Sequence, residues 1–219
     1  MQPMSETERT APGRALIRTL DADHLALIEQ HLLALPERDR YLRFGYPAQD
    51  EHVQRYVAKL DFAHDELFGI FDADLQLVAL AHLAYLDVPG REHLAEFGVS
   101  VGPSLRGRGY GQQLFERCVV HARNHGVSRL IIHALSENAA MLRIARKAGA
   151  SVVREGSESE ACLDLPPADF GSQVGELLAE GLARTDYHLK AGVKQVRGVI
   201  DLVHEIREGV RDARDQTRP

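Results

Sequence analysis

The chain has 219 residues, of which 44% are hydrophobic and 26% charged, and its formal net charge at pH 7 is −6. This composition predicts a folded protein with one well-buried core, and it disfavours general nucleic-acid binding, which needs a basic surface. No segment approaches the roughly 18 apolar residues of a membrane span, and the polar N-terminus lacks a signal-peptide core. We therefore expect a cytoplasmic protein that has neither nucleic acid nor membrane as a partner.

The first half of the chain alternates between strand-like and helix-like apolar patterns. Residues 1–12 are polar, contain two prolines and are predicted to form a disordered tail. Asp21 or Asp23 is expected to cap the first helix, and Asp50 to begin the second. The predicted elements are a strand at 15–18, a helix with apolar residues between 25 and 32, a helix with apolar residues between 53 and 60, and a hairpin of strands 66–71 and 77–85 turning at 72–74.

A strand at residues 94–101 leads into a glycine-rich, cationic loop at residues 106–111, and a helix-patterned segment follows. The exposed N–H groups in the first turn of such a helix favour an anion, and the helix dipole adds to this preference. Glycines let the backbone approach a diphosphate closely, and arginine side chains add charge-assisted contacts. The segment therefore predicts a site for a pyrophosphate-bearing ligand.

Two better-known phosphate loops do not fit this segment. A P-loop requires a Lys-Ser/Thr pair after its last glycine, where this chain has two glutamines. The dinucleotide fingerprint requires a third glycine three residues after its second, where this chain has glutamine or leucine. The remaining pattern is Arg106-x-x-Gly109-x-Gly111.

A second strand–helix unit follows the first. Residues 129–135 predict a strand, Asn138 is expected to begin a helix, and Gly149 to end it. The last predicted elements are strands at 151–154 and 161–165 around a polar loop at 155–160, before two prolines end the domain.

Together, the loop at residues 106–111 and the helix between Asn138 and Gly149 resemble the coenzyme A binding segments of the GNAT superfamily of N-acetyltransferases. Residues 39–44 and the Met-Leu-x-x-Ala-Arg variant of the second helix are similar to acetyltransferase domains of bacterial protein-lysine acetyltransferases. The resemblance implies an α/β domain over residues 13–170 in the order β-α-α-β-β-β-α-β-α-β-β. Its central sheet would be mixed, mostly antiparallel, and flanked by helices.

The resemblance implies acetyl-CoA as the co-substrate. In relatives the strand backbone meets the pantetheine, the glycine-rich loop holds the pyrophosphate, and the second helix meets the pantetheine arm and the 3′-phosphate. The residues of this chain at those positions are Val99, Val101, Arg106, Gly107, Arg108, Gly109, Tyr110, Gly111, Asn138 and Arg143, with Arg146 as the alternative to Arg143 at the 3′-phosphate.

The resemblance also implies that a primary amine attacks the thioester directly in a ternary complex, without a covalent enzyme intermediate. Glu96, near the start of the strand before the loop, is the candidate general base. Many family members place a Tyr seven residues after the motif Asn as the acid for the leaving thiolate, and here that residue is Ala145. Ser136 is our candidate acid, with Tyr110 and Tyr85 as alternatives.

The histidines raise the question of a metal. His121 and His125 lie four residues apart on one helix face, a spacing that zinc can use. No third ligand is evident in the sequence. We therefore expect solvated surface histidines and no metal ion.

The acceptor is less constrained by the sequence. Residues 40–65 are expected to line the acceptor side, because relatives set specificity in that region. A protein lysine, a polyamine and an aminoglycoside-like amine stay open as acceptors. Because Ala145 replaces the usual Tyr, a non-catalytic acetyl-CoA-binding regulator is the alternative function.

Residues 171–219 predict a helical C-terminal extension with apolar residues near heptad spacing. Glycines within this helix weaken it, each by roughly 1 kcal/mol relative to Ala, so we expect it to have a packing partner; they are Gly181, Gly192, Gly198 and Gly209. The partner can be the chain's own domain, a second copy of the chain, or the active cleft. We predict a homodimer that requires this extension.

Overall fold

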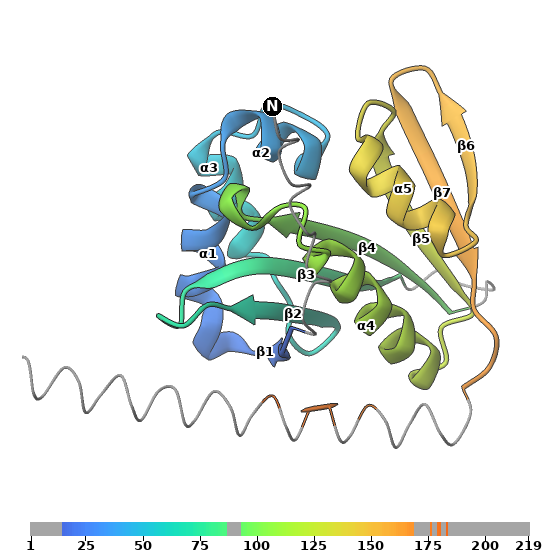
Figure 1. Cartoon of the computed structure of the whole chain (residues 1–219), viewed down its shortest axis with the longest axis horizontal. Helices are drawn as coiled ribbons and strands as arrows, with labels where there is room; N and C mark the ends of the chain where they lie inside the picture. Colours follow the sequence, from blue (N-terminus) through green and yellow to red (C-terminus); the bar gives the residue numbers. More distant parts are fainter. Residues whose placement is uncertain (1–14, 87–92, 169–175, 177–178, 181–182, 184–219) are drawn as a thin grey trace, which may run out of the picture.

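A seven-stranded sheet runs through the part of the chain that the computed structural model describes, residues 15–86, 93–168, 176, 179, 180 and 183 (Figure 1). The strand order is β1-β2-β3-β4-β5-β7-β6, and every neighbouring pair is antiparallel except β4–β5. This confirms the mixed, mostly antiparallel sheet. The strands are β1 Ile17–Leu20, β2 Asp65–Phe71, β3 Leu77–Leu86, β4 Leu94–Val101, β5 Arg129–Leu135, β6 Ser151–Glu155 and β7 Glu158–Asp164.

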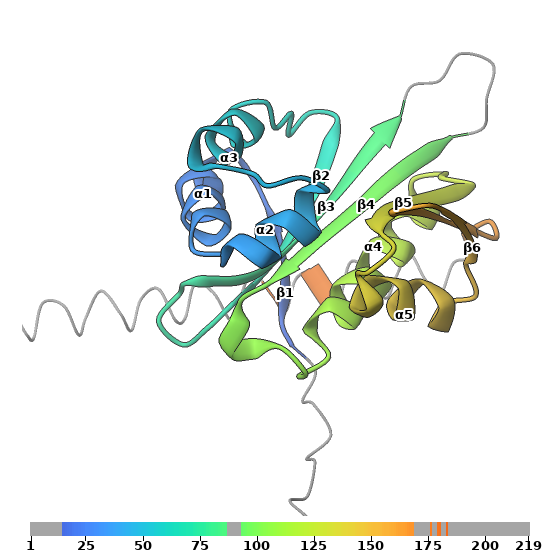
Figure 2. The ribbon, with the colours of Figure 1, turned by 90° about the horizontal axis from the view of Figure 1, so that it is seen from above.

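Helices cover both faces of the sheet. Figure 2 shows α1, α2 and α3 on one side of β3 and β4, and α4 and α5 on the other. Each face buries its own apolar cluster, one against α1 and α3 and the other mainly against α4. None of the described helices has the length and apolarity needed to cross a bilayer. The helices are α1 Leu25–Leu33, α2 Glu37–Phe44, α3 Asp50–Val57, α4 Tyr110–Asn124 and α5 Ala139–Lys147, with 3-10 turns at Ala22–His24 and Pro103–Leu105.

The structure corrects the predicted element order at α2. Three helices, not two, separate the first two strands, and α2 has no buried residue. It therefore lacks the apolar stripe by which the other helices were predicted. Pro36 stands directly before α2, and Gly45 follows it with a φ of 81°, so both ends carry common helix-boundary residues.

The closing hairpin also differs from the expectation. The predicted polar loop at residues 155–160 is much shorter, because β7 already begins at Glu158. A two-residue turn, Gly156 and Ser157, joins the two strands, and Gly156 takes a φ of 63°. Residues 158–161 of β7 alternate between exposed and buried, which is typical of a strand with one exposed face.

The parallel pair β4–β5 is short. Its register contains only Leu94↔Arg129, Ala95↔Leu130 and Glu96↔Ile131. Beyond these residues β5 stays paired with β7 along its whole length, and β4 stays paired with β3. Among the described residues, the β5-facing edge of β4 after Glu96 has no strand partner, and this edge opens into the site described below.

Most of the predicted extension 171–219 and the predicted tail 1–12 lie outside the described residues. The four described residues beyond Ala168 are helical. Two of them contact α4: Glu176 forms an ion pair with Arg117, and Glu180 accepts a hydrogen bond from the same guanidinium at 2.8 Å. These described residues of the extension therefore pack against the chain's own domain.

Candidate active site

The glycine-rich loop turns β4 into α4 through two left-handed residues. Gly107 has a φ of 74° and Gly109 a φ of 77°, a region that glycine enters without steric cost. Gly109 is the N-cap of α4, and no side chain caps the helix there. A Cβ on Gly111 would lie 3.3 Å from Ile144, so glycine also allows α4 and α5 to approach closely. The first-turn N–H groups of α4 are thus available to an anion.

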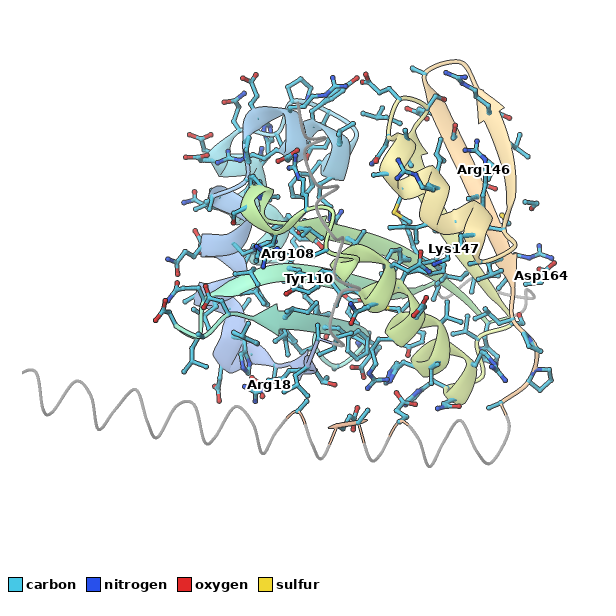
Figure 3. The ribbon with its side chains drawn as sticks, viewed as in Figure 1. Arg18, Arg108, Tyr110, Arg146, Lys147 and Asp164 are labelled. Atoms are coloured by element: carbon cyan, nitrogen blue, oxygen red, sulfur yellow. The ribbon has the colours of Figure 1, made fainter. Side chains whose placement is uncertain are left out.

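A cavity of about 460 Å³ lies at this helix start. It is walled by the end of β4, the loop, and the first turns of α4 and α5. Every cofactor residue predicted from the sequence lines it except Arg108. Figure 3 shows Arg108 in the loop ahead of Tyr110, and Arg146 and Lys147 further along α5. The predicted residues in the lining are Val99, Val101, Arg106, Gly107, Gly109, Tyr110, Gly111, Asn138 and Arg143.

Two of these residues also hold the cavity walls together. Arg106 forms an ion pair with Asp39 of α2. Asn138 caps α5, because its Oδ1 accepts a hydrogen bond from the backbone of Met141 at 3.1 Å, and its Nδ2 donates to Leu42 O at 3.3 Å. These contacts therefore connect α2, which was not predicted from the sequence, to the starts of α4 and α5, which were predicted.

A second cavity, of about 550 Å³, continues from the first on the other side of the gap between β4 and β5. The two linings share Leu42, Arg43, Val99, Asn138 and Met141, so the cavities meet where the strands diverge. Four carboxylates and one imidazole also line the second cavity: Glu96, Glu155, Glu158, Glu160 and His133. The predicted base therefore lies in the cavity opposite the glycine-rich loop.

Glu96 does not stand alone on that wall. Its Oε1 lies 3.3 Å from His133 Nδ1, and His133 Nε2 lies 3.3 Å from Glu160 Oε2. All three side chains are about half exposed, at 44%, 57% and 53%. From the sequence, His133 is predicted only as part of the strand at 129–135. The signal that identifies it is strand register, which places His133 opposite Glu160.

Arg43 occupies the junction of the two cavities. Its guanidinium packs so closely on β4 that a Cβ on Gly98 would lie 2.8 Å from Arg43 Cζ. Arg43 Nη2 donates to the Tyr56 hydroxyl at 2.9 Å, and that oxygen lies 2.7 Å from His82 Nδ1. His82 Nε2 is in turn 3.2 Å from Asp65 Oδ2. A chain of polar contacts thus runs from Arg43 of α2 through Tyr56 of α3 and His82 of β3 to Asp65 of β2.

Burial determines the protonation of that chain. Burial raises the pKa of Tyr56, and the charge and hydrogen bond of Arg43 oppose this only in part. Burial and the Arg43 charge lower the pKa of His82, although Asp65 and Glu96 oppose them. Near neutral pH the phenol therefore keeps its proton and can donate it to Nδ1 of a neutral His82.

The candidate acid Ser136 lines neither cavity, although two of its hydrogen-bond partners, Glu158 and Ser159, line the second. Its Oγ is 3.1 Å from Gly156 O, 2.9 Å from Glu158 O and 2.9 Å from Ser159 Oγ, so it serves the turn between β6 and β7. Of the alternatives, Tyr110 lines the first cavity. Ser136 as the acid stays a prediction.

The structure corrects the expectation of solvated histidines for His121, whereas His125 is exposed as predicted. His121 is buried, and its Nδ1 lies 2.5 Å from Glu176 Oε1 while its Nε2 lies 3.5 Å from Glu66 Oε1. Burial alone would lower the pKa of His121, but the hydrogen bonds to the two carboxylates outweigh it and raise the pKa. No local sequence pattern predicts the contact between His121 and Glu176, because the two residues lie 55 positions apart along the chain.

Donor atoms of His121, His125 and Glu176 lie within 4.8 Å of one another, the kind of grouping that can hold a metal ion. Glu176 is already used by other donors, since it is paired with Arg117 and accepts a hydrogen bond from Asn124. We therefore interpret the group as the contact between α4 and the C-terminal segment.

Comparison with known families agrees with this architecture. A family profile described as "Acetyltransferase (GNAT) domain" matches residues 14–151, from just before β1 to the first residue of β6. The chain belongs to the GNAT acetyltransferase family. The match includes the glycine-rich loop, the predicted base and α5, so both helix starts at the first cavity are family features.

Solved structures share the fold of this GNAT acetyltransferase at low sequence identity. The GNAT domain of S. lividans PAT has a TM-score of 0.59 and 20% identity, over 68% of this chain and 89% of that one. Spermidine N-acetyltransferase from Vibrio cholerae, in complex with CoA and spermine, has a TM-score of 0.55 and 16% identity, over 69% and 95%. Ribosomal-protein-alanine N-acetyltransferase from Brucella melitensis has a TM-score of 0.55 and 18% identity, over 68% and 99%.

Proposed function

We propose that this GNAT protein transfers the acetyl group of acetyl-CoA to a primary amine, by direct attack of the amine in a ternary complex. The observation that carries the proposal is the meeting of two cavities at Arg43, Val99 and Asn138. One cavity begins at an uncapped helix N-terminus, and the other contains Glu96. A thioester that reaches the junction from the first cavity faces an amine that enters from the second.

The first cavity suits the cofactor by its charge and its backbone. The N–H groups at the start of α4 would receive the pyrophosphate, with Arg106 beside them. Arg143 lines the same cavity from α5 and can meet a phosphate. The edge of β4 after Glu96 would offer backbone groups at Val99 and Val101 to the pantetheine, because no described strand pairs with it there.

A general base is needed because the acceptor amine must lose a proton before it can attack the thioester. A lysine-like amine has a reference pKa of about 10.4, so only about one molecule in a thousand is neutral at pH 7. Making it neutral costs about 4 kcal/mol, and a positioned base lowers this barrier. Direct transfer to an ordinary carboxylate would be uphill by about 8 kcal/mol. Glu96 therefore needs neighbouring groups or water that take the proton further.

The second cavity favours a cationic acceptor. Glu96, Glu155, Glu158 and Glu160 line it, and these carboxylates attract an ammonium group and repel an anionic one. The wall formed by β6 and β7 would hold a second positive charge on the same acceptor. Both a protein lysine with basic neighbours and a small polyamine meet this requirement.

Thiol release tests the proposal. The protein is mixed with acetyl-CoA and a panel of amines that carry one, two or three positive charges, and free thiol is measured over time. We expect amine-dependent release, with higher kcat/KM for multiply charged amines. Tight acetyl-CoA binding with no release for any amine would instead support the non-catalytic regulator.

We further propose that the protein acts in the cytoplasm and forms a homodimer. The net charge of −6 and the ordinary apolar content of 44% support an aqueous compartment. The heptad-like spacing of apolar residues in the C-terminal extension supports self-association.

A further inference from the structure

We propose that His133 and Glu160 form, together with Glu96, a proton relay that carries the amine's proton from the acceptor cavity to solvent. The proposal rests on the acetyl transfer proposed above and names two further residues for it. Glu96 would meet the amine, His133 would pass the proton on, and Glu160 would release it to water.

The relay follows from strand register. His133 of β5 stands directly opposite Glu160 of β7 in an antiparallel pair, so the two side chains share one face of the sheet. Glu96 of β4 pairs with Ile131, two residues before His133 on β5, which places Glu96 diagonally next to the imidazole on that face. The ring lies between two carboxylates, at 3.3 Å from each.

The separations suit proton transfer. An N···O distance of 3.3 Å is slightly longer than a usual hydrogen bond, and catalytic contacts in free enzymes often tighten when substrate binds. One imidazole nitrogen can accept a proton while the other donates its own, so a histidine can pass a proton without a net change of charge. Glu160 is 53% exposed, which lets it exchange protons with bulk water.

The other charged groups of the cavity help to set the direction of transfer. Glu155 and Glu158 line the same wall and favour positive charge near the ring. Arg43 is the cationic residue that α2 contributes to the lining, at the end where the cavity meets the cofactor cavity. A proton is therefore repelled from the Arg43 end and attracted toward the β6–β7 wall.

The reaction balances as follows. Glu96 takes one proton from the bound ammonium, and the freed lone pair attacks the thioester carbonyl carbon. The carbon–sulfur bond breaks, and coenzyme A leaves as a thiolate. Glu96 passes its proton to His133 Nδ1 while His133 Nε2–H passes to Glu160, which releases a proton to water. The second amine proton, lost on forming the amide, ends on the thiolate or in solvent.

Reference pKa values explain why a histidine improves on a carboxylate alone. Transfer from an amine of pKa about 10.4 to an ordinary carboxylate is uphill by about six units, but to an ordinary imidazole by only about four. The first transfer, from the amine to Glu96, is the steep one. Onward transfer from an ordinary carboxylic acid to an ordinary imidazole is downhill by about two units, so His133 draws the proton away from Glu96.

The pH dependence of His133→Gln tests the relay. Glutamine keeps a similar size and hydrogen-bonding ability but cannot carry a proton. At pH 7 we expect kcat/KM for the amine to fall by about ten-fold or more, with acetyl-CoA affinity unchanged. The deficit should shrink as the pH approaches the pKa of the amine, because a neutral amine needs no relay. Added imidazole should restore activity to His133→Ala. A deficit of the same factor at every pH, or none at pH 7, would overturn the proposal.

A matched control is His93→Gln. His93 is also an exposed histidine, but it lies outside residues 40–65 and lines neither cavity. We expect the pH profile of this variant to match that of the unaltered protein. The outcome also separates the two proposals: no thiol release by the unaltered protein contradicts the transferase, whereas release that His133→Gln leaves intact contradicts the relay alone.

Discussion

At the scale of single residues, His31 shows how burial fixes a charge state. Its Nδ1 lies 3.0 Å from Leu77 O and its Nε2 lies 2.8 Å from Ser100 Oγ. The carbonyl can only accept, so Nδ1 carries the proton and Nε2 accepts from the serine hydroxyl. Burial lowers the pKa of His31 to about 4, although the bond to Leu77 opposes it. This neutral histidine links α1 to β3 and β4.

The His31 environment predicts a loss of stability in mild acid. A histidine whose folded pKa is below its unfolded value of about 6.5 binds protons better when unfolded, so stability falls as the pH drops from 6.5 toward 4. The shift corresponds to about 3 kcal/mol at most. Denaturant unfolding between pH 7 and 4 measures it. His31→Gln should remove this part of the pH dependence; an unchanged slope would contradict the assignment.

Gly98 predicts a functional effect with little loss of stability. The three atoms nearest to a Cβ at this position all belong to the Arg43 guanidinium, the far end of a long side chain, so Gly98→Ala should displace it at a cost of about 1 kcal/mol. Arg43 lies at the junction of the cavities, and we expect kcat/KM to fall several-fold. Steady-state kinetics and thermal unfolding measure the two effects. Full activity would show that the position of Arg43 does not matter.

At the scale of elements, the start of α4 carries the proposed cofactor site. Gly109→Ala forces a left-handed residue with a side chain, at a cost of roughly 1–2 kcal/mol, and disturbs the loop that lines the cavity. Calorimetric titration should show acetyl-CoA affinity reduced by about ten-fold. Gly126→Ala is the matched control, because Gly126 has a φ of 79° just after α4 and lines neither cavity. Equal losses of affinity in both variants would argue against a specific role for the loop.

The elements differ in how far the sequence predicted them. The strand at 129–135 and the α5 helix were predicted closely, because an apolar run, a capping Asn138 and a terminal Gly149 coincide. The α2 helix was missed because it buries no residue and so has no apolar period. The contact between Glu96 and His133 was missed for a different reason: it depends on the register of two strands, which no local pattern encodes.

At the scale of the whole molecule, Glu176 joins the C-terminal segment to α4. Burial alone would raise the pKa of Glu176, but hydrogen bonds from His121, Arg117 and Asn124 lower it to about 2. The carboxylate's contribution is therefore present above pH 4.5 and lost as the pH falls toward 2. The raised pKa of His121 makes its contribution complete below about 6.5 and lost as the pH rises through the folded value.

The opposite pH dependences of Glu176 and His121 define a pH window in which the contact between the C-terminal segment and α4 is strongest. Glu176→Gln should lower the thermal unfolding temperature most between about pH 4.5 and 6.5, where both groups are charged. The difference should shrink below pH 4.5, and in part at higher pH, where Arg117 still pairs with the carboxylate. A difference that is constant from pH 3 to 9 would mean that ionic pairing does not hold the segment.

The predicted homodimer is a property of the full chain. Light scattering should give the mass of two chains for the full-length protein and of one chain for a protein ending at Gly171. The described residues of the extension already pack on α4, so the alternative is an extension that serves only its own domain. A shortened protein that keeps the full-length mass would contradict the prediction.

The most direct test follows the acetyl group itself. Acetyl-CoA with an isotope-labelled acetyl group is incubated with the full-length protein and a multiply charged amine, and mass spectrometry locates the label. Direct transfer predicts one labelled amide on the amine for each thiol released, no label on the protein without an acceptor, and a much slower reaction with Glu96→Gln. Absence of labelled amide with every amine, or label that first accumulates on the protein, would contradict it.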